Sequence, residues 1–400
     1  MTPARLRSGA WFARAPVRAL SAALVLVYLA ALAAYALTGD GLADYKGRPL
    51  GTDFVSFWAA GRLALDGAPE AAYDLDRHAE AERRAIGRDT LPYYAWHYPP
   101  IFLLLMLPFA LLPYGWSLAL WLAATLAAYL AVAARLSRDR LAIWLALAFP
   151  AAFVNLIHGQ NAFLSAALVG GALHLLRTRP AAAGALVGVL AFKPQLGLVV
   201  PFALAAGRHW RCFAAAAATV VALAGASLLA FGWPTWQAFA ANSGFAWDVT
   251  LVQGAAGWPK LQSAFAATRL LGGPAWLGAV VQAAVSVAAT AVVVWLWRRP
   301  AAFELKAAAL PLAALLATPF VLDYDLLLLA PAIAFFAADG ARRGFLPWEI
   351  TALAALWLLP PFARPLATAF GVPLAAPMLI AALALVVRRA RRMPADAEGA

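Results

Sequence analysis

The sequence contains a single cysteine, Cys212, among 400 residues. One thiol excludes an intrachain disulfide, and no Cys/His cluster indicates a metal site. Charged residues are also scarce, at 12% of the chain, whereas hydrophobic residues make up 64%. A soluble chain of this length would need far more polar surface. We therefore expect an integral membrane protein.

Motifs of nucleotide and hydrolase chemistry are missing too. No Walker loop, nucleotide-binding glycine fingerprint, HExxH or serine-hydrolase elbow occurs at a suitable strand-to-helix junction. No Gly/Ser linker and no internal repeat divides the chain. Residues 1–400 are therefore predicted to form one integral membrane domain, for which we expect neither a cofactor nor a metal ion.

Apolar runs recur along the whole chain at lengths that suit membrane-spanning helices. The sequence predicts an all-α polytopic protein with about twelve such helices, near residues 19–37, 116–134, 141–157, 161–176, 181–192, 195–206, 212–231, 275–297, 304–321, 326–338, 347–362 and 370–387. The first run follows a basic N-terminus and could instead be a cleaved signal peptide. Its 19 residues favour a spanning helix, because the apolar core of a signal peptide is shorter.

Some apolar segments are too short to cross the membrane alone. We pair residues 181–192 with 195–206 as a hairpin that has Lys193-Pro194 at its tip. Residues 98–112 are interpreted as a juxtamembrane or re-entrant helix, because a span there would place the basic loop after residue 134 on the opposite side.

The charges sort by side of the membrane. The loops and chain ends on the side of the N-terminus hold 20 Lys/Arg, one of which is Arg138, and 6 Asp/Glu. The loops on the other side hold 11 Lys/Arg and 13 Asp/Glu. Basic loops stay in the cytoplasm, so both termini are predicted to be cytoplasmic. The net charge of +12 then reflects orientation in a bacterial inner (plasma) membrane, and no nucleic-acid partner is expected. The long loops 38–115 and 232–274 are predicted to lie outside.

Charged side chains at the ends of spans are costly and therefore functional candidates. Asp53 opens an amphipathic segment whose aromatic residues Phe54, Phe57 and Trp58 suggest a helix in the membrane interface, with its rings toward the acyl chains. Asp53 is then either a helix cap or a general base that takes a proton from a hydroxyl. His97 and Tyr98 follow in the same loop as candidate substrate contacts.

Four further segments on the same predicted face carry polar candidates. Each has a plain structural alternative: snorkelling for a lone lysine, a hydrogen-bonded turn, or a solvated helix. Lys193 in "VLAFKPQLG" and the cations of "PKLQSAFAATR" are candidate phosphate contacts, and paired carboxylates could bind a metal or share acid–base work. The candidates are Lys193, Lys260 and Arg269 for phosphate, and His158, Gln160, Asn161, Asp323 and Asp325 for substrate.

Four segments together resemble glycosyltransferase family 87. They are "TDFVSFWAAGRLALDGAPEAAYD", "HYPPIFLLLMLPFALLP", "HGQNAFLSAALVGGALHLL" and "AGALVGVLAFKPQLGLVVPFAL", in that order. The resemblance covers roughly residues 15 to 330 and implies the C-type glycosyltransferase fold.

The resemblance implies a mechanism. Family members move mannose or arabinofuranose from a polyprenyl-phosphate sugar to a glycolipid or glycan acceptor at the outer face of the membrane. By motif, Asp53 holds the position of the catalytic aspartate, which would make this a mannosyltransferase-like enzyme of the cell envelope. No second acid accompanies Asp53 within the motif, so we expect direct displacement with inversion. Two alternatives stay open: a polytopic transporter or lipid flippase, which usually places its charges at the midplane of repeated halves, and a non-catalytic assembly subunit.

Overall fold

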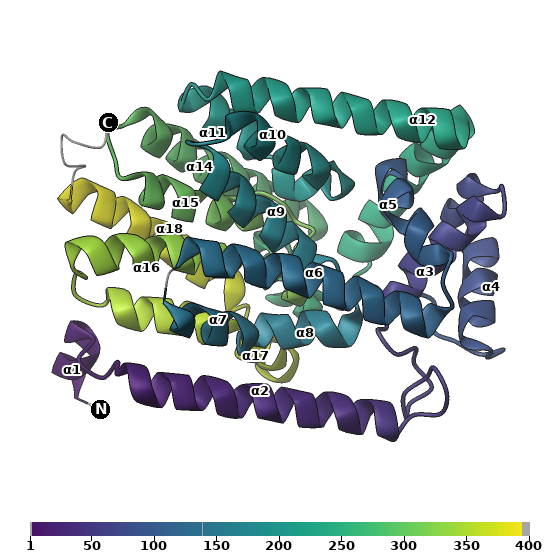
Figure 1. Cartoon of the computed structure of the whole chain (residues 1–400), viewed down its shortest axis with the longest axis horizontal. Coiled ribbons are helices and arrows are strands. Elements are labelled where there is room, and N and C mark those ends of the chain that lie inside the picture. Colours follow the sequence, from purple (N-terminus) through teal and green to yellow (C-terminus); the bar gives the residue numbers. More distant parts are fainter. Residues whose placement is uncertain (1, 138, 394–400) are drawn as a thin grey trace.

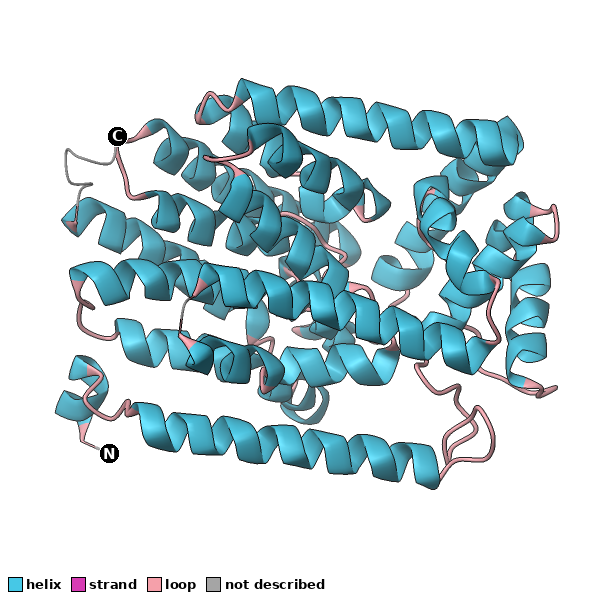
Figure 2. Ribbon diagram, viewed as in Figure 1, coloured by secondary structure: helices cyan, strands magenta, loops and turns pink. Residues whose placement is uncertain are grey.

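A computed structural model describes residues 2–137 and 139–393 as helices joined by loops (Figure 2). Within these residues no strand forms, and only isolated β-bridges occur, such as the one between Leu261 and Leu322. The predicted all-α class is therefore confirmed. Arg138, which was counted among the basic loop residues, lies outside the described residues.

The first half of the chain contains two long helices, α2 (Arg14–Leu37) and α6 (Tyr114–Leu136), among shorter ones. The shorter α-helices are α1 (Pro3–Ser8), α3 (Phe54–Leu65), α4 (Leu75–Ile86), α5 (Pro100–Ala110), α7 (Arg140–Leu147), α8 (Pro150–His158), α9 (Ala162–Leu175), α10 (Pro180–Val189) and α11 (Val200–Ala206). Short 3₁₀ helices are η1 (Pro69–Tyr73), η2 (Leu190–Phe192) and η3 (Pro194–Gly197).

The second half contains the longest helix, α12, which bends at Gly232 and continues into a π-helical segment. Its elements are α12 (Trp210–Ala246), η4 (Trp247–Val252), η5 (Trp258–Lys260), α13 (Ala264–Leu270), α14 (Ala275–Arg298), α15 (Phe303–Leu316), η6 (Asp323–Leu328), α16 (Leu329–Arg343), α17 (Glu349–Phe370) and α18 (Ala375–Arg392).

Among the described residues, six helices are long and apolar enough to cross a membrane, or seven if the pair α7–α8, bent by 49°, is one span. The six are α2, α6, α12 with η4, α14, η6 with α16, and α17. The expected count of twelve is therefore not confirmed.

The difference has a physical cause. The apolar segments predicted as spans are helical, but α9 has 14 residues and α10 has 10. At about 1.5 Å per residue, α9 reaches about 21 Å, which falls short of a hydrocarbon core of about 30 Å. Most side chains of α9 and α15 are buried inside the protein. Their apolarity serves the packed interior, which hydropathy alone does not distinguish from lipid contact.

The helices lie side by side in a bundle, with α2 and α12 along opposite edges and α3, α4 and α5 at one end (Figure 1). The start of α2 and the end of α18 lie together at the other end. The basic residues of these two segments, such as Arg14, Arg18 and Arg388, therefore gather there. This end is called the basic end below.

Helix α3 differs from the expected interface helix. Phe54 and Phe57 are buried, at 0% and 1% exposure, rather than directed to lipid. Phe57 packs edge-on against Tyr98 and Trp121, with ring centroids 5.2 and 6.3 Å apart. The aromatic face of α3 therefore anchors this helix in the protein core, because α5 and α6 cover it.

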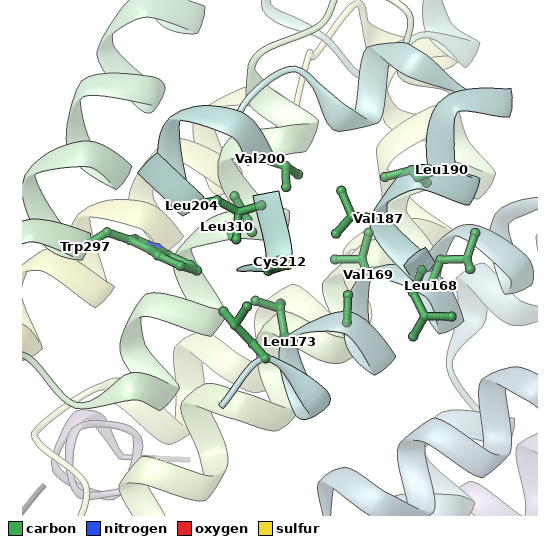
Figure 3. Close-up of a pocket in the computed structure, with 13 residues that line it drawn as sticks. Leu168, Val169, Leu173, Val187, Leu190, Val200, Leu204, Cys212, Trp297 and Leu310 are labelled. Carbon is green, nitrogen blue, oxygen red and sulfur yellow. The ribbon is translucent and has the colours of Figure 1, made fainter. Parts of the chain in front are cut away.

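A small gap remains where α9, α10, α11, α12, α14 and α15 meet (Figure 3). Its volume is about 20 Å³, and apolar side chains such as Leu173, Val187 and Leu310 point into it together with Cys212. No polar group lines it to hold water, so it is a packing defect rather than a binding site.

Candidate functional site

Polar side chains from six separate parts of the chain meet inside the bundle. They come from the residue before α3, the segment before α5, the α8–α9 turn, the η2–η3 junction and the loops that carry η5 and η6. We call this group the polar cluster; its members are Asp53, Tyr98, Gln160, Asn161, Lys193, Lys260, Tyr324 and Asp325. Seven of these eight residues were candidates from the sequence, and Tyr324 was not.

Asp53 is held by the α8–α9 turn. Its backbone N–H donates to the carbonyl of His158 at 3.0 Å. Gln160 Nε2 donates to Asp53 Oδ2 at 3.0 Å and to the Tyr324 hydroxyl at 3.1 Å. Gln160 therefore joins the first loop of the chain to η6.

Glycine permits this close approach. Gly159 ends α8 with a φ of +62°, and a Cβ there would lie 2.6 Å from Phe54 Cβ. Any larger residue would combine a strained backbone with a clash. The α8–α9 turn therefore packs directly on the residues that carry Asp53.

Asp53 does not cap α3. It precedes the helix with φ −78° and ψ −18°, and its side chain makes no capping hydrogen bond. Its carboxylate instead faces Gln160, Thr52 and Lys260, with Lys260 Nζ 3.7 Å from Oδ2. The structure therefore disagrees with the cap alternative.

The carboxylate of Asp53 is ionised at neutral pH. Burial raises its pKa, but the electrostatic effect of Lys260, with a smaller one from His158, and the hydrogen bonds from Gln160 and Thr52 outweigh burial and lower that pKa below its ordinary 3.8. The side chain keeps 15% of its surface exposed. Asp53 is thus a charged, partly exposed hydrogen-bond acceptor.

Lys193 is buried and does not snorkel, since only 2% of its side chain is exposed. Its ammonium donates to Asp325 Oδ1 at 2.5 Å and to Asn161 Oδ1 at 3.2 Å. Asn161 Nδ2 in turn donates to the Tyr98 hydroxyl at 2.8 Å. The Lys193–Asp325 pair therefore forms the buried part of the polar cluster, and neither side chain is accessible from outside.

The second long loop contributes one of its two expected cations. Lys260 lies beside Asp53, and its ammonium is 5.6 Å from the ring centroid of Tyr324. Arg269 instead donates to the carbonyls of Gly273 and Val252 at 2.9 and 3.2 Å. Arg269 therefore holds the loop together, and its contacts do not include the polar cluster.

The remaining candidates from the sequence lie in three different surroundings. His158 lies beside Tyr324, with ring centroids 6.0 Å apart. Asp323 pairs with Arg364 of α17 at 3.0 Å. His97 lines a separate groove of about 470 Å³, between the η1–α4 region and α12.

Two residues of this region, Tyr324 and Arg364, were not predicted from the sequence. Tyr324 stands between two recognised carboxylates, and burial of the three consecutive residues 323–325 is not a pattern that periodicity predicts. Arg364 could have been found, because it is a lone cation in an apolar run, as Lys193 is.

A buried His–Glu pair on α4 supports α3 from behind. A ring nitrogen of His78, Nε2, lies 3.1 Å from the carbonyl of Ser56 in the first turn of α3. Glu82 Oε2 accepts from the backbone N–H of Tyr94 at 3.1 Å. Burial raises the pKa of Glu82 to about 9 and lowers that of His78 to about 4, so both are neutral at pH 7.

Glu82→Gln should therefore raise stability at pH 7, because the wild-type carboxyl is neutral when folded but ionises on unfolding, which favours the unfolded chain, and Gln cannot ionise. The pKa of Glu82 is higher in the folded than in the unfolded chain, so the wild type loses stability as pH rises from about 6 to 9, by up to about 1.4 kcal/mol per pH unit. Glu82→Gln removes that loss. Thermal unfolding at pH 6 and pH 9 measures it, with the exposed Glu80→Gln as the control that keeps the wild-type slope.

The site thus offers one partly exposed, ionised carboxylate, one partly exposed cation and a row of hydroxyl and amide groups. Within residues 2–137 and 139–393, no group of three or more His, Cys, Asp or Glu side chains is arranged to hold a metal ion. Such a set suits recognition of a polyol beside a phosphate, with the carboxylate placed to accept a hydroxyl proton.

The model of glycosyltransferase family 87 matches residues 96–322, more than half of the chain. The match includes Tyr98, Gln160, Asn161, Lys193 and Lys260, whereas Asp53 and the 323–325 turn lie outside it. No curated protein and no solved structure matches the chain.

Proposed function

Because the chain belongs to glycosyltransferase family 87, we propose that it transfers a sugar of the mannose or arabinofuranose class from a polyprenyl-phosphate donor to a lipid-linked or glycan acceptor. That it is a membrane glycosyltransferase follows from the family and from the apolar helices. The donor, the sugar class, the outer-face location and the catalytic roles are the proposal. Its main support is the ionised, non-capping carboxylate of Asp53 beside Lys260.

The orientation belongs to the same proposal. The loop before α3 and the basic end lie at opposite ends of the bundle (Figure 1). If the basic end faces the cytoplasm of a bacterial cell, both termini are cytoplasmic and Asp53 is approached from outside. Residues 38–115 and 232–274 then form the outer loops. Nucleotide sugars are made in the cytoplasm and would not be available at this outer face. A polyprenyl-phosphate sugar would be, because its lipid carries both the sugar and the phosphate leaving group there.

The proposed reaction is a direct displacement. The acceptor hydroxyl attacks the anomeric carbon while Asp53 removes its proton. The new carbon–oxygen bond forms as the bond from that carbon to the phosphate oxygen breaks, and polyprenyl phosphate leaves with the electron pair. The leaving group is an anion and needs a fixed cation more than a proton. Because the hydroxyl attacks from the face opposite the departing phosphate, the configuration of the anomeric carbon inverts.

Lys260 is the better candidate for the donor phosphate, because Lys193 is buried against Asp325. Lys260 lies beside the carboxylate of Asp53, where its partly exposed ammonium would contact the phosphate of a bound donor. When the ammonium of Lys260 turns toward the phosphate, the charge that most lowers the pKa of Asp53 moves away. The pKa of Asp53 then rises, and Asp53 becomes a stronger base. We propose that Lys193, Asn161 and Tyr98 position Gln160, and that Arg269 holds the loop that carries Lys260. The 323–325 turn would line the acceptor side.

Lys260→Gln should weaken use of the donor and shift the pH profile. We expect the KM for the donor to rise about tenfold or more, since a charge-assisted contact to phosphate is lost. The rate requires ionised Asp53 and falls as pH drops through its pKa. Without Lys260 that pKa rises, so the loss of rate begins at higher pH than in the wild type. The measurement is kcat/KM against pH, with the exposed Lys46→Gln as the control.

The donor class is tested with the purified protein and labelled sugar. Polyprenyl-phosphate mannose, polyprenyl-phosphate arabinofuranose and the matching nucleotide sugars are each supplied with a membrane lipid extract as acceptor. We expect label to move only from a polyprenyl-phosphate donor. Transfer from a nucleotide sugar in the absence of lipid phosphate would refute the proposed donor.

A further inference from the structure

A crevice opens between α2 and α7 at the basic end of the bundle, away from the loop that carries Asp53. It encloses about 880 Å³ and is lined by Arg14, Arg18, Arg140, Trp144 and small alanine side chains. Figure 1 shows α2 along an edge of the bundle. Ser21 is its buried residue, so most of this helix is open to its surroundings.

The mouth of the crevice is positively charged. Arg14 pairs with Asp139 at 2.9 Å, and Asp139 also accepts from the N–H of Leu141 at the start of α7. Arg18 and Arg140 are exposed, and neither makes an ion pair or side-chain hydrogen bond in the described part of the chain. Three arginines against one aspartate leave a net charge of +2, and two guanidinium groups stay free for an anion.

An apolar cavity continues from the same mouth into the bundle. It measures about 340 Å³ and shares Arg14, Asp139 and Leu141 with the crevice. It lies between α6, α7, α16 and α17, where its walls include Leu145, Ala338 and Trp357. A small soluble anion would bind the arginines but would not fill this apolar cavity.

We propose that this crevice and cavity together bind one anionic phospholipid from the membrane leaflet at the basic end. The phosphate would lie between Arg18 and Arg140, and one acyl chain would fill the cavity behind them. Basic pockets between membrane helices recognise anionic head groups in this way. The site is separate from the polar cluster and independent of the proposed transferase reaction.

Native mass spectrometry of the purified full-length protein tests the proposal. The protein in a neutral detergent receives equal amounts of phosphatidylglycerol and phosphatidylcholine. We expect one phosphatidylglycerol to be retained in preference to phosphatidylcholine. Each arginine near an anionic head group contributes about fivefold in affinity, so Arg18→Gln/Arg140→Gln should weaken retention about 25-fold. Arg211→Gln/Arg298→Gln, which removes two exposed arginines elsewhere at this end, should retain the lipid.

Two more variants keep the result decisive if the glutamine pair folds poorly. Arg18→Lys/Arg140→Lys keeps the charge and should retain phosphatidylglycerol, whereas Ala338→Leu fills the cavity and should weaken its retention. Equal retention of both lipids, unchanged retention by the glutamine pair and by Ala338→Leu, or preference for added polyprenyl phosphate would each overturn the proposal.

Discussion

Replacing Asp53 by Asn should lower the rate of sugar transfer by about 10²–10⁴-fold and leave the protein folded. Asn has nearly the same shape, and its carbonyl oxygen can still accept the bond from Gln160. It cannot take a proton from an acceptor hydroxyl. Because Asp53 makes no capping bond to α3, the substitution removes no helix cap. The effect should therefore lie in kcat rather than in stability.

The matched control is Asp66→Asn, at the other end of α3. Asp66 is half exposed and pairs with Arg62 at 3.1 Å, so its loss removes a surface ion pair of little consequence. Transfer of labelled sugar in membranes with equal amounts of each variant gives the comparison. An Asp53→Asn protein as active as Asp66→Asn would show that Asp53 is not the base.

Replacing Lys193 by Met should destabilise the protein by about 3–5 kcal/mol, because it leaves the carboxylate of Asp325 buried without its cation. Cys212 provides the measurement. It is the chain's one thiol and is 1% exposed, so a fluorogenic maleimide labels it chiefly on unfolding. The temperature at which labelling begins should fall in Lys193→Met.

Two further variants separate the pair from general damage. Lys193→Met/Asp325→Asn removes both charges and should recover much of the lost stability. Lys46→Met changes an exposed lysine and should behave as the wild type does. If the double variant is no more stable than Lys193→Met, the buried pair does not explain the loss.

The polar cluster could be predicted in large part because charged and amide groups stand out in an apolar chain. Asp53, Gln160, Asn161, Lys193, Lys260 and Asp325 were recognised in that way, and they meet in the structure. Which of them pair could not be predicted. Lys193 looked like a phosphate contact, since nothing in its own segment shows that Asp325, 132 residues later, neutralises it.

The fold was predictable at a coarser level. Hydropathy located the helices but could not separate those that cross a membrane from those buried in the protein. α9 and α15 are apolar because they fill the interior. The aromatic residues of α3 were assigned to lipid for the same reason, although α5 and α6 cover them. Local periodicity gives the face of a helix and not the identity of what packs on it.

The most direct test of the central claim, direct displacement with Asp53 as base, is the anomeric configuration of the transferred sugar. Nuclear magnetic resonance coupling constants would compare this carbon in the polyprenyl-phosphate donor and in the product. A single displacement predicts inversion, because one carboxylate acts as a base and no covalent sugar intermediate forms. A product that retains the donor's configuration would contradict the account.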